Sequence, residues 1–107
     1  MRDVADAEFD AVVLHAGGRV VVDFWAPWCK PCRAIEPLLE QLVEARPGVE
    51  LVRVDIDANP VTATRYSVLS IPTVILVEQG EARETIVGAR SRSHYERAIA
   101  EWLARAA

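Results

Sequence analysis

Apolar residues follow two kinds of spacing along the chain, one typical of strands and one typical of helices. Short, nearly continuous apolar runs rich in β-branched residues occur at residues 19–25, 50–56 and 72–77, as in strands that are buried on both faces. The segment between the first two runs predicts a helix over residues 31–45, bent at Pro37. Its apolar residues fall at helical spacing: Ala34, Ile35, Leu38, Leu39, Leu42 and Val43. A strand, a crossover helix and a second strand indicate a parallel pair in an α/β fold.

Two further helices are predicted, one before the first strand and one after the second. Asp6 is expected to cap a first helix that runs to about His15, with two glycines beyond it. A short helix is expected over residues 57–66, with Asn59 as a plausible cap and Pro60 in its first turn.

The last third of the chain predicts a hairpin and a final helix. Gln79 and Gly80 suit a turn, after which residues 84–87 pair back as a strand. Ser91 or Ser93 is expected to cap the helix, whose inward residues are Tyr95, Ala98, Ile99, Trp102 and Leu103. Together these elements predict a single mixed sheet of four to five strands with helices on both faces.

Length and charge narrow the class of protein. The 107 residues are expected to form one domain over residues 1–107. Twelve Lys and Arg against 16 Asp and Glu give a formal net charge of -4, without the basic excess that nucleic acid or an anionic membrane surface requires. The apolar runs are too short for a membrane span, and the N-terminus has no apolar signal core. We therefore expect a monomer in the cytoplasm, where a permanent structural disulfide is rare.

The chemistry of the chain concentrates in the pentapeptide Trp28-Cys29-Lys30-Pro31-Cys32. It falls between a predicted buried strand and the first turn of a helix, at the sheet edge where open α/β sheets place active sites. Cysteines three apart at a helix start lie within reach of a disulfide, and the helix N-terminus favours a thiolate at Cys29. We expect Cys29 to be the more exposed nucleophile, which forms a mixed disulfide. Cys32, one turn inward, is then the resolving thiol that leaves a Cys29–Cys32 bond.

Other interpretations of the cysteine pair are weaker. A structural disulfide across so short a ring removes little chain entropy. A zinc site needs four ligands, and His15 and His94, the two histidines, have no ligand spacing to the cysteines or to each other. We therefore expect redox chemistry and no metal.

The stretch from Val22 to Cys32, Val-Asp-Phe-Trp-Ala-Pro-Trp-Cys-Lys-Pro-Cys, resembles the active-site sequence of the thioredoxin family. Matching segments follow at residues 54–57, 70–73, 79–80 and 87–88, and the resemblance extends over residues 4–103. It implies the thioredoxin fold and a dithiol–disulfide oxidoreductase that reduces disulfides in substrate proteins. It also implies a thioredoxin reductase partner, an NADPH-dependent flavoprotein that supplies electrons. The chain has no dinucleotide fingerprint of its own, so we expect no bound cofactor.

Asp23 and the Ile71–Pro72 bond are candidates for supporting roles. Burial of Asp23 in an apolar run should raise its pKa, and such a carboxylate can take and return the Cys32 proton. The resemblance implies this carboxylate beneath the cysteines; alternatively, Asp23 only satisfies backbone donors. The resemblance also implies a cis Ile71–Pro72 bond packed against the cysteines, which presents the Ile71 backbone to an extended substrate. The alternative is a trans proline at a strand start.

Two tryptophans and a basic residue complete the expected site. Trp28 is expected to line an exposed docking surface with Ile71 and Pro72, and Trp25 to pack beneath it; core packing is the alternative for both tryptophans. Arg53 matches a family lysine next to the buried carboxylate, where a guanidinium would limit the rise in the Asp23 pKa. Alternatively, Arg53 and Asp55 form a solvated pair at the strand end.

The chain departs from the family pattern in two places. Most thioredoxins have glycine at the position of Lys30, which with Pro31 is expected to tune the thiol. A cation beside Cys29 favours the thiolate. We therefore expect a more acidic Cys29 thiol and a more oxidising Cys29–Cys32 couple than in a Lys30→Gly variant. Only residues 1–4 precede the first predicted helix, so the first strand of the family's sheet is expected to be short or absent.

Two other functions stay open on the same fold. One is a non-catalytic binding module, in which the thiols are incidental. The other is a disulfide oxidase or isomerase in an oxidising compartment, which a reduction potential near that of strong oxidants would indicate.

Overall fold

A computed structural model describes residues 1–105, and five strands of these residues form one mixed sheet in the order β1-β3-β2-β4-β5. β1 and β2 each pair with β3 in parallel, whereas β4 is antiparallel to both β2 and β5. The strands are β1 (Arg2–Asp3), β2 (Arg19–Trp25), β3 (Val49–Asp55), β4 (Thr73–Glu78) and β5 (Glu81–Val87). The predicted mixed sheet is confirmed, and its first strand is indeed short, with two residues in the ladder.

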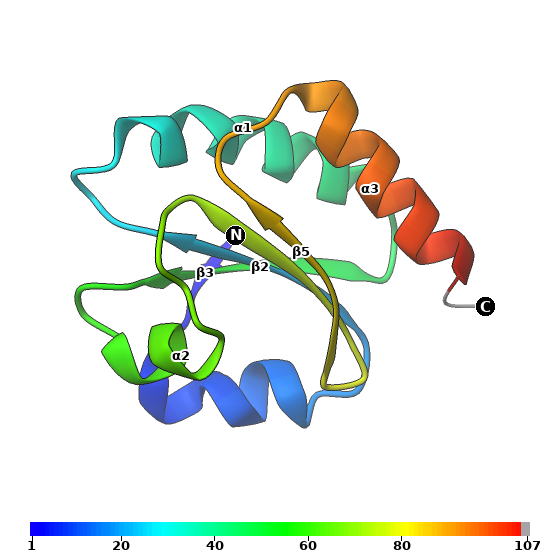
Figure 1. The fold of residues 1–107 in the computed structure, drawn as a ribbon. Helices are drawn as coiled ribbons and strands as arrows, with labels where there is room; N and C mark the ends of the chain where they lie inside the picture. The colour runs from blue at the N-terminus through cyan, green and yellow to red at the C-terminus, as the bar shows by residue number, and fades with distance from the viewer. Residues whose placement is uncertain (106–107) are drawn as a thin grey trace.

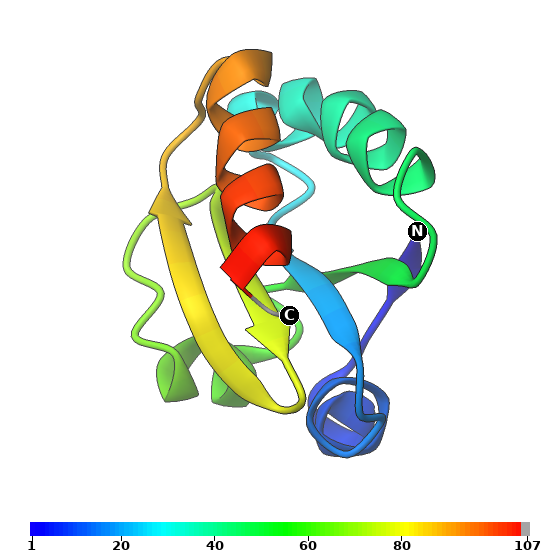
Figure 2. The ribbon, with the colours of Figure 1, turned by 90° about the vertical axis from the view of Figure 1, so that its right-hand side faces the viewer.

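Helices cover both faces of this sheet, as predicted (Figure 1 and Figure 2). On one face lie α1 (Lys30–Glu44) and α3 (Arg92–Arg105); on the other lie α2 (Pro60–Arg65) and two short N-terminal helices, η1 (Asp6–Glu8) and η2 (Asp10–Leu14). Pro37 lies inside α1 without ending it. None of the helices in the described part of the chain has both the length and the apolar character needed to cross a membrane.

β2 is buried on both faces, which explains its nearly continuous apolar sequence. Val20, Val22 and Phe24 face η2 and α2, and Val21 faces α1 and α3. Because side chains alternate along a strand, Asp23 lies on the same face as Val21, under α1. The core on this face is built largely from the two long helices, by Ile35, Leu39, Leu42, Tyr95, Ile99 and Trp102.

The prediction of one N-terminal helix capped by Asp6 is wrong. Residues 6–14 form a 3₁₀ turn followed by a π-helical turn, and the Asp6 carboxylate instead caps α2. It accepts hydrogen bonds from the N–H groups of Val61 (3.1 Å) and Thr62 (2.8 Å). Asn59 occupies the N-cap position of α2, but its side chain accepts from the Asp6 N–H (2.8 Å). Asp6 thus caps α2, and Asn59, more than fifty residues away in sequence, accepts from the N–H at the start of η1. The local sequence pattern does not show such a tertiary arrangement.

The C-terminal hairpin is longer than predicted, because β5 begins at Glu81 rather than at residue 84. Gln79 and Gly80 form its two-residue turn with φ values of 47° and 81°, the positive angles that suit a tight hairpin. A Cβ atom on Gly80 would lie 2.7 Å from the Leu14 carbonyl oxygen, so this turn requires glycine. Of the two candidate caps for α3, Ser91 takes the role, with its Oγ accepting from the N–H of His94 (3.2 Å).

Candidate active site

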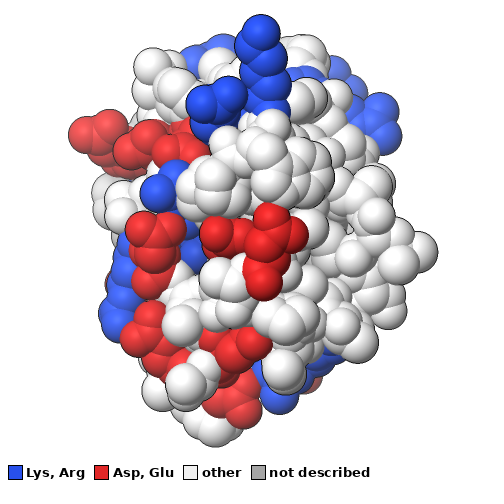
Figure 3. Space-filling model, turned by 90° about the vertical axis from the view of Figure 1, so that its left-hand side faces the viewer, with Lys and Arg blue, Asp and Glu red and all other residues white. Residues whose placement is uncertain are grey.

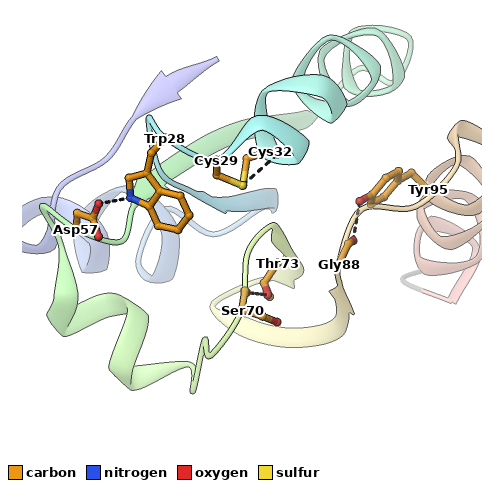
Figure 4. Close-up of a disulfide and its surroundings, with 8 residues drawn as sticks. All are labelled: Trp28, Cys29, Cys32, Asp57, Ser70, Thr73, Gly88 and Tyr95. Atoms are coloured by element: carbon orange, nitrogen blue, oxygen red, sulfur yellow. Dashed lines mark hydrogen bonds between the residues drawn. A yellow bond between two sulfur atoms is a disulfide. The ribbon is translucent and has the colours of Figure 1, made fainter.

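The two cysteines lie at the start of α1, which follows β2. They are joined by a disulfide, and their Cα atoms are 5.3 Å apart (Figure 4). Cys29 is the N-cap residue of α1, and its Sγ accepts a hydrogen bond from the Cys32 N–H (3.2 Å). Cys29 keeps 4% of its surface exposed and Cys32 none. This N–H and the positive end of the helix dipole both favour negative charge on the Cys29 sulfur, so a thiolate formed there on reduction is stabilised by the helix.

Asp23 lies near the end of β2, on the sheet face that α1 covers, and is fully buried. Neither of its carboxylate oxygens has a hydrogen-bond partner among residues 1–105, so Asp23 does not satisfy backbone donors. Burial, the largest effect, raises its pKa to about 7, and the negative charge of Glu36 acts in the same direction. The Arg53 guanidinium opposes both effects. Asp23 can therefore exchange a proton near neutral pH.

Arg53 joins three elements around this carboxylate. It is the register partner of Asp23 on β3, and its Nη1 donates to both carboxylate oxygens of Glu36, at 3.0 and 2.9 Å. Its Nε donates to Asp3 on β1, and its guanidinium carbon lies 4.0 Å from the ring centroid of Trp25, a cation–π contact. Arg53 thus pairs with Glu36 and Asp3 instead of forming a solvated pair with Asp55.

Glu36 is a site residue that the sequence analysis missed. It follows Cys32 by four residues, so it lies on the same face of α1, one turn further along. The spacing of four residues from Cys32 is the sequence signal that could have identified Glu36.

Trp28 lies on the surface beside the disulfide, with 65% of its area exposed. Its indole Nε1 donates to the Asp57 carboxylate (2.7 Å) in the loop after β3 (Figure 4). Core packing is therefore wrong for Trp28. Asp57 was predicted only as the start of a short helix and as part of a segment that matches the family; in the structure it holds the indole on one flank of the cysteines.

Ile71 and Pro72 lie on the other flank. The bond between them is cis, and the half-buried Ile71 side chain packs against the cluster that contains both cysteines. The Pro72 carbonyl accepts from the Gly88 N–H at 2.8 Å. The backbone N–H and C=O of Ile71 make no hydrogen bond with any of residues 1–105. An unpaired backbone beside the disulfide is available to an extended peptide.

Charged side chains of both signs lie around the disulfide. Lys30 and Arg33 are exposed in the first turn of α1, and Asp57 lies on the opposite side of Trp28. Figure 3, which views this end of the molecule, shows basic side chains along its upper edge, acidic ones in its middle and lower left, and a broad uncharged area.

No metal centre is evident in the part of the chain that the structure describes. Within residues 1–105, no three His, Cys, Asp or Glu side chains gather as metal ligands. His15 and His94 are both exposed, one after η2 and the other in α3.

Comparison with known proteins identifies a family. Residues 1–101 match the family model described as Thioredoxin. A thioredoxin of Streptomyces clavuligerus is 46% identical over 93 residues, which cover 87% of each chain. A thioredoxin of Listeria monocytogenes is 36% identical over 104 residues, 96% of this chain and 99% of the relative. The chloroplastic thioredoxin M4 of Arabidopsis thaliana is 39% identical over 102 residues, 94% of this chain, which spans only 53% of that longer relative.

Proposed function

This chain belongs to the thioredoxin family and is a dithiol–disulfide oxidoreductase, and we propose that it reduces protein disulfides with Cys29 as the attacking thiol and Cys32 as the resolving thiol. The observation that carries this assignment is the position of the Cys29 Sγ. It caps α1, accepts the Cys32 N–H and is already bonded to its partner sulfur. A sulfur held in this way is favoured as a thiolate, and its neighbour is close enough to close the ring.

The reaction balances in two exchanges. In the reduced protein, the Cys29 thiolate attacks one sulfur of a substrate disulfide; that S–S bond breaks, one substrate thiolate leaves, and a mixed disulfide forms. Cys32 then loses its proton and attacks the Cys29 Sγ, which releases the second substrate thiolate. The substrate gains two electrons, its two thiolates take up protons from water, and the protein is left as the Cys29–Cys32 disulfide with the Cys32 proton on an acceptor group.

Asp23 acts in the second exchange as the group that accepts the Cys32 proton and returns it on reduction. Its full burial beneath α1 and a pKa near 7 support this role. Arg53 and Trp25 support Asp23 from β3 and β2, while Lys30 and Pro31, between the cysteines, tune the Cys29 thiol.

The substrate lies as an extended segment between the two flanks of the disulfide. The free backbone groups of Ile71 pair with it as an added strand, and Trp28 offers an exposed flat face next to Pro72. A backbone interaction of this kind depends little on sequence, so many disulfide-containing proteins can serve as substrates.

Regeneration requires a separate reductase, which we assign to an NADPH-dependent flavoprotein, a thioredoxin reductase. We place the protein in the cytoplasm as a monomer of one domain. The family match over residues 1–101 supports a single domain. The formal charge of -4 gives no support for a nucleic-acid or membrane partner.

The test is turnover of a disulfide protein in the presence of dithiothreitol. The wild type should accelerate reduction, and Cys29→Ser should abolish the acceleration. Reduced Cys32→Ser, mixed with the substrate after dithiothreitol has been removed, should accumulate a mixed disulfide visible by mass spectrometry. No acceleration, or full activity in Cys29→Ser, would refute the proposal. A partner that still binds after both cysteines are replaced would favour the binding module. A reduction potential near that of strong oxidants would favour an oxidase or isomerase.

A further inference from the structure

Tyr95 in α3 is buried but does not take part in the mechanism above. Its ring lies in the core between α3 and the sheet, with Ile99 and Trp102, and it has no exposed surface. Its hydroxyl lies at the edge of this core and makes two hydrogen bonds. It donates to the Gly88 carbonyl (3.1 Å, Figure 4) and accepts from the Arg90 N–H (3.2 Å). A hydroxyl in an apolar core is costly unless it is paired, and here its donor and one acceptor position are both used.

The segment that Tyr95 binds is itself tied to the loop beside the disulfide. The Gly88 N–H donates to the Pro72 carbonyl (2.8 Å), and the Arg90 Nε donates to the Val87 carbonyl (3.1 Å). Gly88 has a φ of 85°, in the left-handed region, so the chain turns sharply directly after β5. A continuous series of hydrogen bonds therefore runs from the core of α3, through Gly88, to Pro72.

We propose that Tyr95 is a positioning residue for substrate binding, whose hydroxyl fixes the Gly88–Arg90 turn and, through Gly88, the backbone of Ile71 and Pro72. This inference rests on the proposed function, in which an extended substrate pairs with Ile71. Ile71 makes no backbone hydrogen bond of its own with residues 1–105, so its position depends on its neighbours. The hydrogen bond from the Gly88 N–H to the Pro72 carbonyl holds the residue that directly follows Ile71.

The direct test is Tyr95→Phe, which keeps the ring and removes only the hydroxyl. Reduced protein is mixed with a cyclic peptide disulfide long enough to lie along Ile71, and separately with 5,5′-dithiobis(2-nitrobenzoate), a small disulfide that needs no extended pairing. For the peptide, we expect the half-saturating concentration to rise about fivefold, as for one lost hydrogen bond, with the maximal rate unchanged. The rate with the small disulfide should stay within about twofold of the wild type.

The chain offers a matched control in Tyr66→Phe. Tyr66 packs on the opposite face of the sheet against Phe9 and Phe24, so the loss of its hydroxyl should leave both reactions unchanged. Equal half-saturation for Tyr95→Phe and wild type overturns the inference. An equal loss with both disulfides also overturns it, because the defect then lies in the thiols. If the wild type reduces neither disulfide, the proposed function is refuted instead.

A measurement on the wild type keeps the inference testable if Tyr95→Phe does not fold. Hydrogen exchange of the Gly88 and Arg90 amides should be slowed at least tenfold relative to the exposed, unpaired amide of a free peptide, although Arg90 lies at the surface. The Arg90 amide reports its bond to Tyr95 and the Gly88 amide its bond to Pro72, so exchange of either amide at the free-peptide rate would break the series of hydrogen bonds and overturn the inference.

Discussion

Replacing the buried acid, Asp23→Asn, should stabilise the oxidised protein increasingly as the pH rises. In the folded state, burial raises the pKa of Asp23 from 3.8 to about 7. Between these values the unfolded chain has lost its proton while the folded protein still holds it, so folding stability falls as pH rises. The interval spans about three pH units at about 1.4 kcal/mol each, so the ionised carboxylate costs the folded state about 4 kcal/mol above pH 7. Asparagine cannot ionise and avoids this cost.

The assay is urea unfolding of the oxidised wild type and variant, followed by circular dichroism between pH 3 and pH 9. The difference in unfolding free energy should be constant below about pH 4, rise in favour of the variant between about pH 4 and pH 7, and then level off. Asparagine brings its own buried polar groups, which add a constant offset but no pH dependence. The exposed Glu40→Gln, also on the α1 side of the molecule, serves as the control and should show no such rise. A difference that stays flat across this range would refute the assignment of Asp23 as a buried acid with a raised pKa.

Three further changes test the surroundings of the site and the fold. Glu36→Gln removes a negative charge that raises the Asp23 pKa, so carbon NMR titration should find that pKa below about 7. Asp6→Ala removes the cap of α2 and should lower the free energy of unfolding in urea by about 1 kcal/mol. Lys30→Gly removes a cation next to Cys29, so the equilibrium with glutathione should give a more negative reduction potential than that of the wild type.

Each of these predictions has an outcome that contradicts it. An Asp23 pKa that stays the same or rises in Glu36→Gln would show that Glu36 does not act on it. Asp10→Ala, which breaks only an exposed ion pair with Arg65, is the control for Asp6→Ala; an equal loss in both variants would argue against a cap at Asp6. Identical potentials for Lys30→Gly and wild type would show that solvent screens the lysine.

Much of the site followed from sequence because its determinants are local. The Cys29–Cys32 spacing, the apolar run around Asp23 and the helical pattern after Pro31 each depend on residues within one turn or one strand. The helix found, Lys30–Glu44, differs from the predicted range by one residue at each end. The match to a known family then added the Ile71–Pro72 loop and Arg53, which lie more than twenty residues away in sequence.

Glu36, Asp57 and Tyr95 show what local pattern missed. Each acts through a partner on another element: Glu36 on Arg53, Asp57 on Trp28, and Tyr95 on Gly88. Asp6 and Asn59 exchange caps in the same way, which is why the predicted N-terminal helix was wrong. A hydrogen bond between distant residues has no periodicity along the chain, so only the folded arrangement shows it.

The order of strands and helices, the buried central strand and the paired cysteines at a helix start were determined by the sequence itself, since spacing and side-chain polarity decide them. Tertiary structure decided which polar groups meet across the sheet. It placed Asp23 without a hydrogen-bond partner among residues 1–105, set Glu36 and Arg53 beside it, and tied the substrate loop to α3. The physical reason is that the pKa of a buried acid and the position of a loop depend on contacts from several elements at once, which the chain brings together only on folding.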